Sequence, residues 1–122
     1  MKTSALSQLS EIEQTAVTTY VRDIRRQYLD RILAVALFGS KARGDDDPES
    51  DIDLLVITDS ENSEFRSALW RIASEISLDY NVLISTHIYS RKRWLKTRQI
   101  GLPFSRAIIT DNIPLTPEPI PV

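Results

Sequence analysis

Gly39-Ser40 and the carboxylates of Asp51 and Asp53 are the residues of this sequence whose types and spacing could do chemistry. An apolar run ends in Gly39-Ser40, ten mostly charged residues follow, and a second apolar run opens with the two aspartates. Side chains alternate along a strand, so Asp51 and Asp53 would share one face, roughly 7 Å apart. Such a pair suits a hard divalent cation such as Mg²⁺, and a glycine beside a serine hydroxyl lets a phosphate approach the backbone closely. Together these groups predict metal-assisted phosphoryl or nucleotidyl transfer.

The two apolar runs are predicted to be neighbouring strands that hold these groups together. Residues 31–40 (RILAVALFGS) and 51–59 (DIDLLVITD) both have the apolar content of a buried strand. If they pair antiparallel, the end of the first lies beside the start of the second. Their connection exceeds the roughly 2–5 residues of most hairpin loops, and long connections are often functional. A solvated acidic turn would not explain Asp53, because a charge in an apolar strand is costly without a partner or a metal.

The other elements are predicted from helix caps and apolar periodicity. Ser10 and Glu13 match a capping box, and an apolar stripe with a four-residue repeat follows them. The further predicted elements are a helix capped by Asn62 or Ser63, a strand over 79–89 (DYNVLISTHIY), a basic helix between Ser90 and Gly101, and a short helix from Pro103 to about Asp111. This order predicts an α/β (α+β) fold with a small mixed β-sheet flanked by helices. Residues 1–115 would form the domain, and the Pro-rich residues 116–122 would be an extended or disordered tail.

Composition excludes several classes of function. The chain has 122 residues, 42% of them hydrophobic, and a net charge of -2, which fits one globular domain rather than a nucleic-acid coat. We therefore expect no stable direct binding to nucleic acid. The absence of cysteine and the single histidine exclude thiolate and His-rich metal sites. With neither a membrane-length apolar run nor a signal-peptide pattern, we expect a cytoplasmic protein that does not bind membranes.

The stretch GSKARGDDDPESDID resembles the G-S-x10-D-x-D signature of the minimal nucleotidyltransferases, in the DNA polymerase beta-like superfamily. The Gly-Ser pair, the ten spacers and the two aspartates all match, and Lys41 to Gly44 look like the usual start of the family's loop. The resemblance extends over about residues 11–115. It implies that two Mg²⁺ ions held by Asp51 and Asp53 bind the triphosphate of ATP or of another nucleotide. Ser40 would hold a terminal phosphate, and Lys41 or Arg43 could neutralise its charge.

The resemblance also implies a third acidic ligand on the next strand. Asp79 is the acidic candidate for this catalytic and metal-binding position, whereas Asn81 stands where the family's aspartate is expected. If both lay on a strand, both could face Asp51 and Asp53. Without a third carboxylate the domain would bind a nucleotide and catalyse weakly or not at all.

Small members of this family are commonly paired with a helical HEPN ribonuclease toxin. The resemblance therefore implies an antitoxin that transfers AMP to a tyrosine of such a partner. A non-catalytic antitoxin that acts by binding, or a transferase that modifies a small hydroxylated compound, are the alternatives.

Other interpretations of these residues are weaker. A calcium loop that starts at Asp45 would need Gly and Glu where Ser50 and Val56 stand, and a receiver domain would place its aspartate at the other end of a strand. We expect a structural or surface role for His87. The basic helix around Trp94, residues 91–98, is either a solvated face or a surface for a partner or for phosphates.

Overall fold

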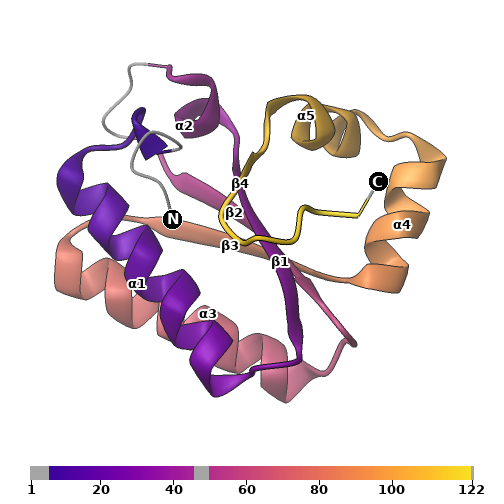
Figure 1. Ribbon diagram of the computed structural model, residues 1–122, viewed down its shortest axis with the longest axis horizontal. Helices are drawn as coiled ribbons and strands as arrows, with labels where there is room; N and C mark the ends of the chain where they lie inside the picture. Colours follow the sequence, from indigo (N-terminus) through magenta and orange to yellow (C-terminus); the bar gives the residue numbers. More distant parts are fainter. Residues whose placement is uncertain (1–5, 46–49, 122) are drawn as a thin grey trace.

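A four-stranded mixed sheet lies at the centre of the computed structural model, which describes residues 6–45 and 50–121 (Figure 1). The strand order is β3-β2-β1-β4. The elements in chain order are α1 (Glu11–Gln27), β1 (Ile32–Phe38), α2 (Ser40–Arg43), β2 (Ile52–Thr58), α3 (Ser63–Tyr80), β3 (Ile84–Ser90), α4 (Arg91–Ile100), α5 (Pro103–Asp111) and β4 (Ile113–Pro114). The predicted fold class, a small mixed sheet flanked by helices, is confirmed.

The pairing of β1 with β2 sets the position of the motif. The two strands are antiparallel, with Phe38 opposite Asp53, so the end of β1 lies beside the start of β2 as predicted. β3 runs parallel to β2 on its other side and places Ser85 opposite Asp53. β4 pairs antiparallel with β1 at the other edge of the sheet.

The sheet separates two hydrophobic cores. Alternate residues of the strands point to opposite faces, and α1 and α3 cover one face with the larger core, which includes Tyr20, Leu54 and Leu69. The other face packs against α4, α5 and the C-terminal segment, with Trp94 fully buried. Figure 1 shows α1 and α3 side by side, away from α4 and α5. Asp53 belongs to the same alternation as Leu55 and Ile57, so its side chain points to the α4–α5 face.

The helix starts follow the predicted caps. Ser10 and Glu13 form the complete capping box at α1, and the side chain of Asn62 accepts the backbone N–H groups of Glu64 and Phe65 at α3. Ser90 caps α4, Gly101 ends it in the left-handed conformation, and Pro103 occupies the first turn of α5. Among the described residues, no helix is long and apolar enough to cross a membrane.

One expectation about the elements is wrong. The third strand does not begin at residue 79, because α3 continues to Tyr80 and β3 starts only at Ile84. Residues 116–121 form neither helix nor strand and pack against the domain, since the side chain of Thr116 accepts the backbone N–H of Val35 and the indole of Trp94 donates to the carbonyl of Pro121 at 2.8 Å. Ile120 is buried in the smaller core.

Candidate active site

Gly39 lies directly against the carboxylate of Asp53. Its φ of +79° and ψ of -159° turn the chain from β1 into the short helix α2, and positive φ is costly for residues other than glycine. A Cβ atom at this position would lie 2.5 Å from Oδ2 of Asp53. A glycine is therefore required here both for the backbone conformation and for the close approach of the carboxylate.

Ser40 begins α2 and faces the other end of the charged connection. Its hydroxyl donates to the hydroxyl of Ser50 at 3.1 Å, which closes the loop between the two strands. The two ends of the charged connection between the strands, at Ser40 and Ser50, are thus in contact. Residues 46–49 of the connection lie outside the described residues.

Asp51 and Asp53 flank Ile52, the first residue of β2. Ile52 is buried in the core beneath α1 and α3, so strand alternation directs the two aspartates to the opposite face. Asp53 is 27% exposed and its Oδ1 lies 3.5 Å from Nε2 of His87, while Asp51 is half-buried just before the strand. Both carboxylates are open enough to take up a ligand.

The donor set fits a metal bound together with a nucleotide. Mg²⁺ is usually held by one or two carboxylates, with substrate phosphates and water completing its octahedron. Within residues 6–45 and 50–121, no three histidines or acids gather as a metal site. Asp51 and Asp53 would therefore hold Mg²⁺ jointly with phosphate oxygens rather than as a complete protein cage.

The two candidates for a third ligand do not lie on β3. Asp79 is exposed in the last turn of α3, and Asn81 is the left-handed residue, with a φ of 52°, that ends this helix. The expectation that they share a strand face with Asp51 and Asp53 is wrong, because the strand begins after them. Ser85 occupies the register position opposite Asp53.

His87 is the residue whose place the sequence interpretation missed. Its Nε2 lies 3.5 Å from Asp53 Oδ1 and 3.4 Å from the hydroxyl of Ser85. Once β3 is known to begin at Ile84, its alternation places Ser85 and His87 on the face of Asp53. The alternation of side chains along the third strand is thus the sequence signal that could have placed His87 beside Asp53.

The two basic residues after Ser40 are both engaged with acids. Lys41 is only 6% exposed, and its ammonium lies 2.9 Å from Oε2 of Glu13 in α1. Arg43 is half-exposed and pairs with Asp45 at 3.1 Å and with Asp111 at 3.5 Å. Lys41 therefore holds α2 against the start of α1, whereas Arg43 remains near the surface at the entrance of the charged loop.

Loss of the Lys41 ammonium is expected to destabilise the domain. In Lys41→Met the carboxylate of Glu13 still accepts a hydrogen bond from the backbone N–H of Ser10, but it loses its buried cationic partner. This loss should lower the free energy of unfolding by about 2 kcal/mol. Urea unfolding measures this. Lys96→Met on the exposed side of α4 removes the same charge and should change stability by less than about 0.5 kcal/mol. Equal losses in both variants would contradict the role of the pair.

The same pair predicts a dependence of stability on pH. Burial acts to raise the pKa of Glu13, but hydrogen bonds from the Ser10 backbone and from Lys41, with the charge of Lys41, lower it below 4.5 overall. A carboxyl whose folded pKa is depressed stabilises the fold above its unfolded pKa, and this contribution disappears as pH falls through the folded value. Glu13→Gln keeps the capping geometry. The free energy of unfolding of Glu13→Gln should be lower than that of the wild type by a constant amount from about pH 7 to about pH 5.5. This difference should shrink below about pH 4.5.

A separate groove is lined by other residues. It has a volume of about 880 Å³ and is lined by α1 and the C-terminal segment, including Arg22, Leu29 and Pro117. None of the motif residues lines it, so it does not belong to the candidate active site.

The comparison with protein families identifies the family to which this chain belongs. The family model for the nucleotidyltransferase domain matches residues 18–115, which contain the Gly-Ser pair and both aspartates. The chain belongs to the nucleotidyltransferase domain family. This nucleotidyltransferase carries its Gly-Ser pair and its two aspartates at one end of the two central strands, where β1 ends and β2 begins.

Relatives of this nucleotidyltransferase are found in Methanocaldococcus jannaschii. Two proteins that bear the name "Putative protein adenylyltransferase" are similar to it. One is 39% identical over 82 residues, which cover 66% of this chain and 81% of the relative. The other is 31% identical over 100 residues, which cover 82% and 94%.

Solved structures share the fold at lower identity. A toxin–antitoxin complex with AMP-PNP matches with a TM-score of 0.52 at 17% identity, covering 81% of this nucleotidyltransferase and 72% of that chain. A mutant of the MntA–HpeT toxin–antitoxin matches with a TM-score of 0.56 at 16% identity, with the same coverage. At these identities the likeness shows the fold of the nucleotidyltransferase.

Proposed function

We propose that this nucleotidyltransferase is an Mg²⁺-dependent protein adenylyltransferase that moves AMP from ATP to a tyrosine hydroxyl of a small HEPN-domain toxin. The observation that carries the proposal is the contact between the backbone of Gly39 and the carboxylate of Asp53. This contact brings a phosphate-binding turn and a metal-binding pair together. The names of the two similar archaeal proteins support protein adenylylation, and the structural likeness to toxin–antitoxin complexes supports a toxin as the partner.

The chemistry requires the groups of the chain to act from different sides of the α-phosphate. Bound Mg²⁺ would act as a Lewis acid on the phosphate oxygens. Asp51 and Asp53 position the α-phosphate, and Ser40 with the adjoining backbone receives the rest of the triphosphate. The acceptor oxygen forms a bond to the α-phosphorus while the bond to the pyrophosphate oxygen breaks. The hydroxyl proton is released to solvent, and pyrophosphate leaves.

An in-line displacement places the acceptor opposite the leaving group. Pyrophosphate leaves toward Gly39-Ser40 at the end of β1, so the acceptor hydroxyl approaches from the β3 side of Asp53. Ser85 and His87 stand on that side. They offer hydrogen-bonding groups where a third carboxylate would help to activate the acceptor.

The absence of that carboxylate from the described part of β3 favours a second candidate function. An antitoxin with weak or no catalysis could neutralise its partner by contact alone. Co-expression of a candidate HEPN-domain toxin with the wild type, Asp51→Ala or Asp53→Ala separates the two functions. An adenylyltransferase loses neutralisation in both variants, while a binding antitoxin retains it in both.

A further inference from the structure

Four rings form an aromatic cluster on the sheet face that carries Asp53. The cluster consists of Phe38, His87, Tyr89 and Phe104, with Phe104 contributed by the first turn of α5. The ring of Phe104 lies 5.8 Å from that of Phe38, 6.1 Å from that of His87 and 6.2 Å from that of Tyr89, on which it stacks. Phe104 thus bridges β1 and β3 above β2.

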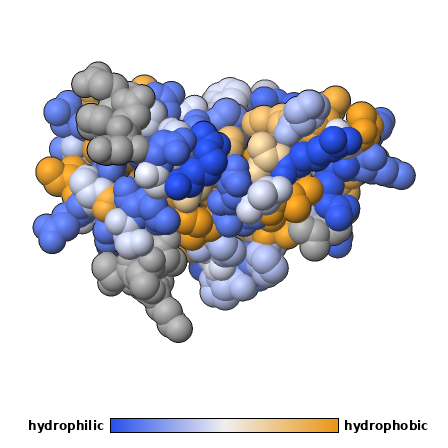
Figure 2. Space-filling model, turned by 90° about the horizontal axis from the view of Figure 1, so that it is seen from above, coloured by the Kyte–Doolittle hydropathy of each residue, from blue (hydrophilic) through white to orange (hydrophobic). Residues whose placement is uncertain are grey.

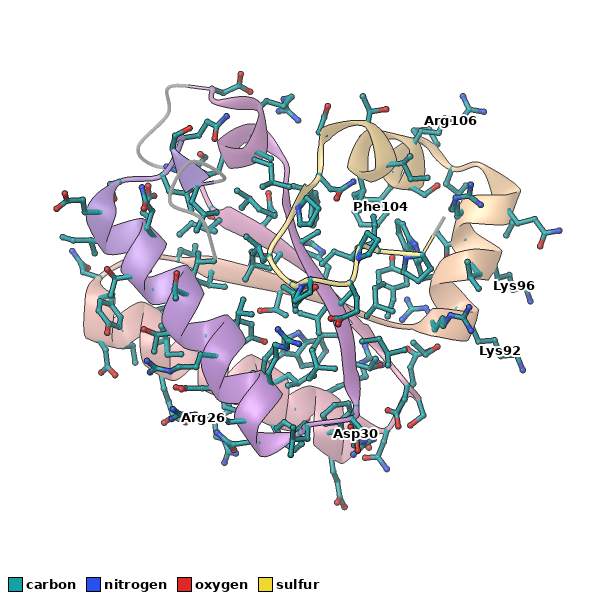
Figure 3. The ribbon with its side chains drawn as sticks, in the orientation of Figure 1. Arg26, Asp30, Lys92, Lys96, Phe104 and Arg106 are labelled. Atoms are coloured by element: carbon teal, nitrogen blue, oxygen red, sulfur yellow. The ribbon has the colours of Figure 1, made fainter. Side chains whose placement is uncertain are left out.

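Phe104 keeps part of its ring accessible although it points toward the sheet. In Figure 3 it extends from α5 into the molecule, whereas Arg106 extends away from it. Its exposed fraction is 37%, compared with 8% for Phe38. Figure 2, which looks onto the end of the molecule with α2 and α5, shows apolar residues exposed among strongly hydrophilic ones.

Two side chains that contact the ring of Phe104, those of Phe38 and His87, also adjoin Asp53. Phe38 is the register partner of Asp53, and His87 contacts the Asp53 carboxylate. A nucleotide whose α-phosphate lies at Asp53 and whose triphosphate extends toward Gly39-Ser40 must direct its ribose and base elsewhere. The half-exposed face of Phe104 is an apolar surface within reach of that base.

We propose that Phe104 is the stacking surface for the nucleobase of the bound triphosphate, an inference that rests on the proposed function and deepens it. Bases stack on aromatic side chains through their π-faces, and each such contact contributes substantially to binding. The packing of Phe104 against three other rings holds it in place before the nucleotide arrives. Binding therefore requires little ordering of this side chain.

Calorimetric titration without any acceptor tests this inference. The probes are Mg²⁺ with ATP and Mg²⁺ with inorganic tripolyphosphate, which has no base. Phe104→Ala should weaken ATP binding about tenfold and leave tripolyphosphate binding unchanged, whereas Phe104→Trp should retain ATP binding. Leu102→Ala removes an exposed apolar side chain from the same corner, outside the cluster, and should bind both probes as the wild type does.

The outcomes separate this inference from the proposed function. A Phe104→Ala protein that binds ATP as the wild type does would overturn the stacking role. If that variant lost only AMP transfer, the ring of Phe104 would instead contact the acceptor. Equal weakening of both probes would also overturn it, because the substitution would have disturbed the phosphate site. A folded wild type that binds neither probe would remove the proposed function itself.

Discussion

Asp53→Asn is expected to lower the rate of AMP transfer by about 10³-fold or more while the domain stays folded. Asparagine has nearly the same shape, but its neutral amide is a poor ligand for Mg²⁺. Losing several kcal/mol of transition-state stabilisation corresponds to a factor of this size. The side chain is partly exposed, and its Oδ1 lies beside the half-buried His87. Because asparagine keeps the shape of aspartate, the change removes no buried packing.

The matched control for Asp53→Asn is Asp79→Asn. It makes the same change of charge at the exposed end of α3, and its transfer rate should equal that of the wild type. Both rates are measured at saturating ATP, and circular dichroism verifies the fold. A rate loss in Asp79→Asn as large as that in Asp53→Asn would show that the residue serves as a third ligand after all.

Gly39→Ala should reduce activity by about 10²-fold and also destabilise the fold. The φ of +79° is strained for alanine, at a cost of about 1–3 kcal/mol. In addition, the new Cβ would lie 2.5 Å from the Asp53 carboxylate, so that carboxylate must move. A displacement of about 1 Å at a reacting centre costs about 10²-fold in rate.

Gly101→Ala is the control that separates the backbone strain of a positive φ from the displacement of the Asp53 carboxylate. Gly101 has nearly the same φ, +77°, at the end of α4, and its added Cβ would meet only the flexible guanidinium of Arg106, at 3.7 Å. Thermal unfolding should show a loss of stability in both variants, at least as large in Gly39→Ala as in Gly101→Ala. Only Gly39→Ala should lose transfer activity, and equal activity in the two variants would contradict the close packing of Gly39 and Asp53 as a functional feature.

The site motif was predictable because its determinants are local. Gly39, Ser40, Asp51 and Asp53 lie within 15 positions, 39–53, and the two strands that hold them have unmistakable apolar runs. The helix caps at Ser10, Asn62 and Ser90 were predictable for the same reason, since each acts within three residues.

The start of the third strand was misplaced because two local signals compete there. Tyr80 and Val82 favour a strand, but Asn81 adopts the left-handed conformation that commonly ends a helix. The Val82 backbone N–H then bonds to the Ser77 carbonyl, and the Ser77 hydroxyl accepts the N–H of Ile84. Asp79 therefore lies in the last turn of α3, and residues 81–83 form the turn that precedes β3.

The packed tail and the buried lysine depend on partners distant in sequence. The prolines of the tail lack N–H groups, which disfavours them in the interior of a helix, but their carbonyls still accept, as the bond from Trp94 to Pro121 shows. Lys41 is buried because Glu13, 28 positions earlier (41 − 13), lies within 2.9 Å in the fold. Neither contact has a signature in the local sequence.

Label transfer from ATP to the partner protein tests the central claim most directly. The purified protein is incubated with Mg²⁺, a candidate toxin partner of the proposed HEPN class, and ATP labelled on either the α- or the γ-phosphate. An adenylyltransferase moves only the α-label to a tyrosine of the toxin, and Asp53→Asn stops the transfer. A toxin that is neutralised in the same mixture without acquiring the α-label would contradict adenylyl transfer as the function of this protein.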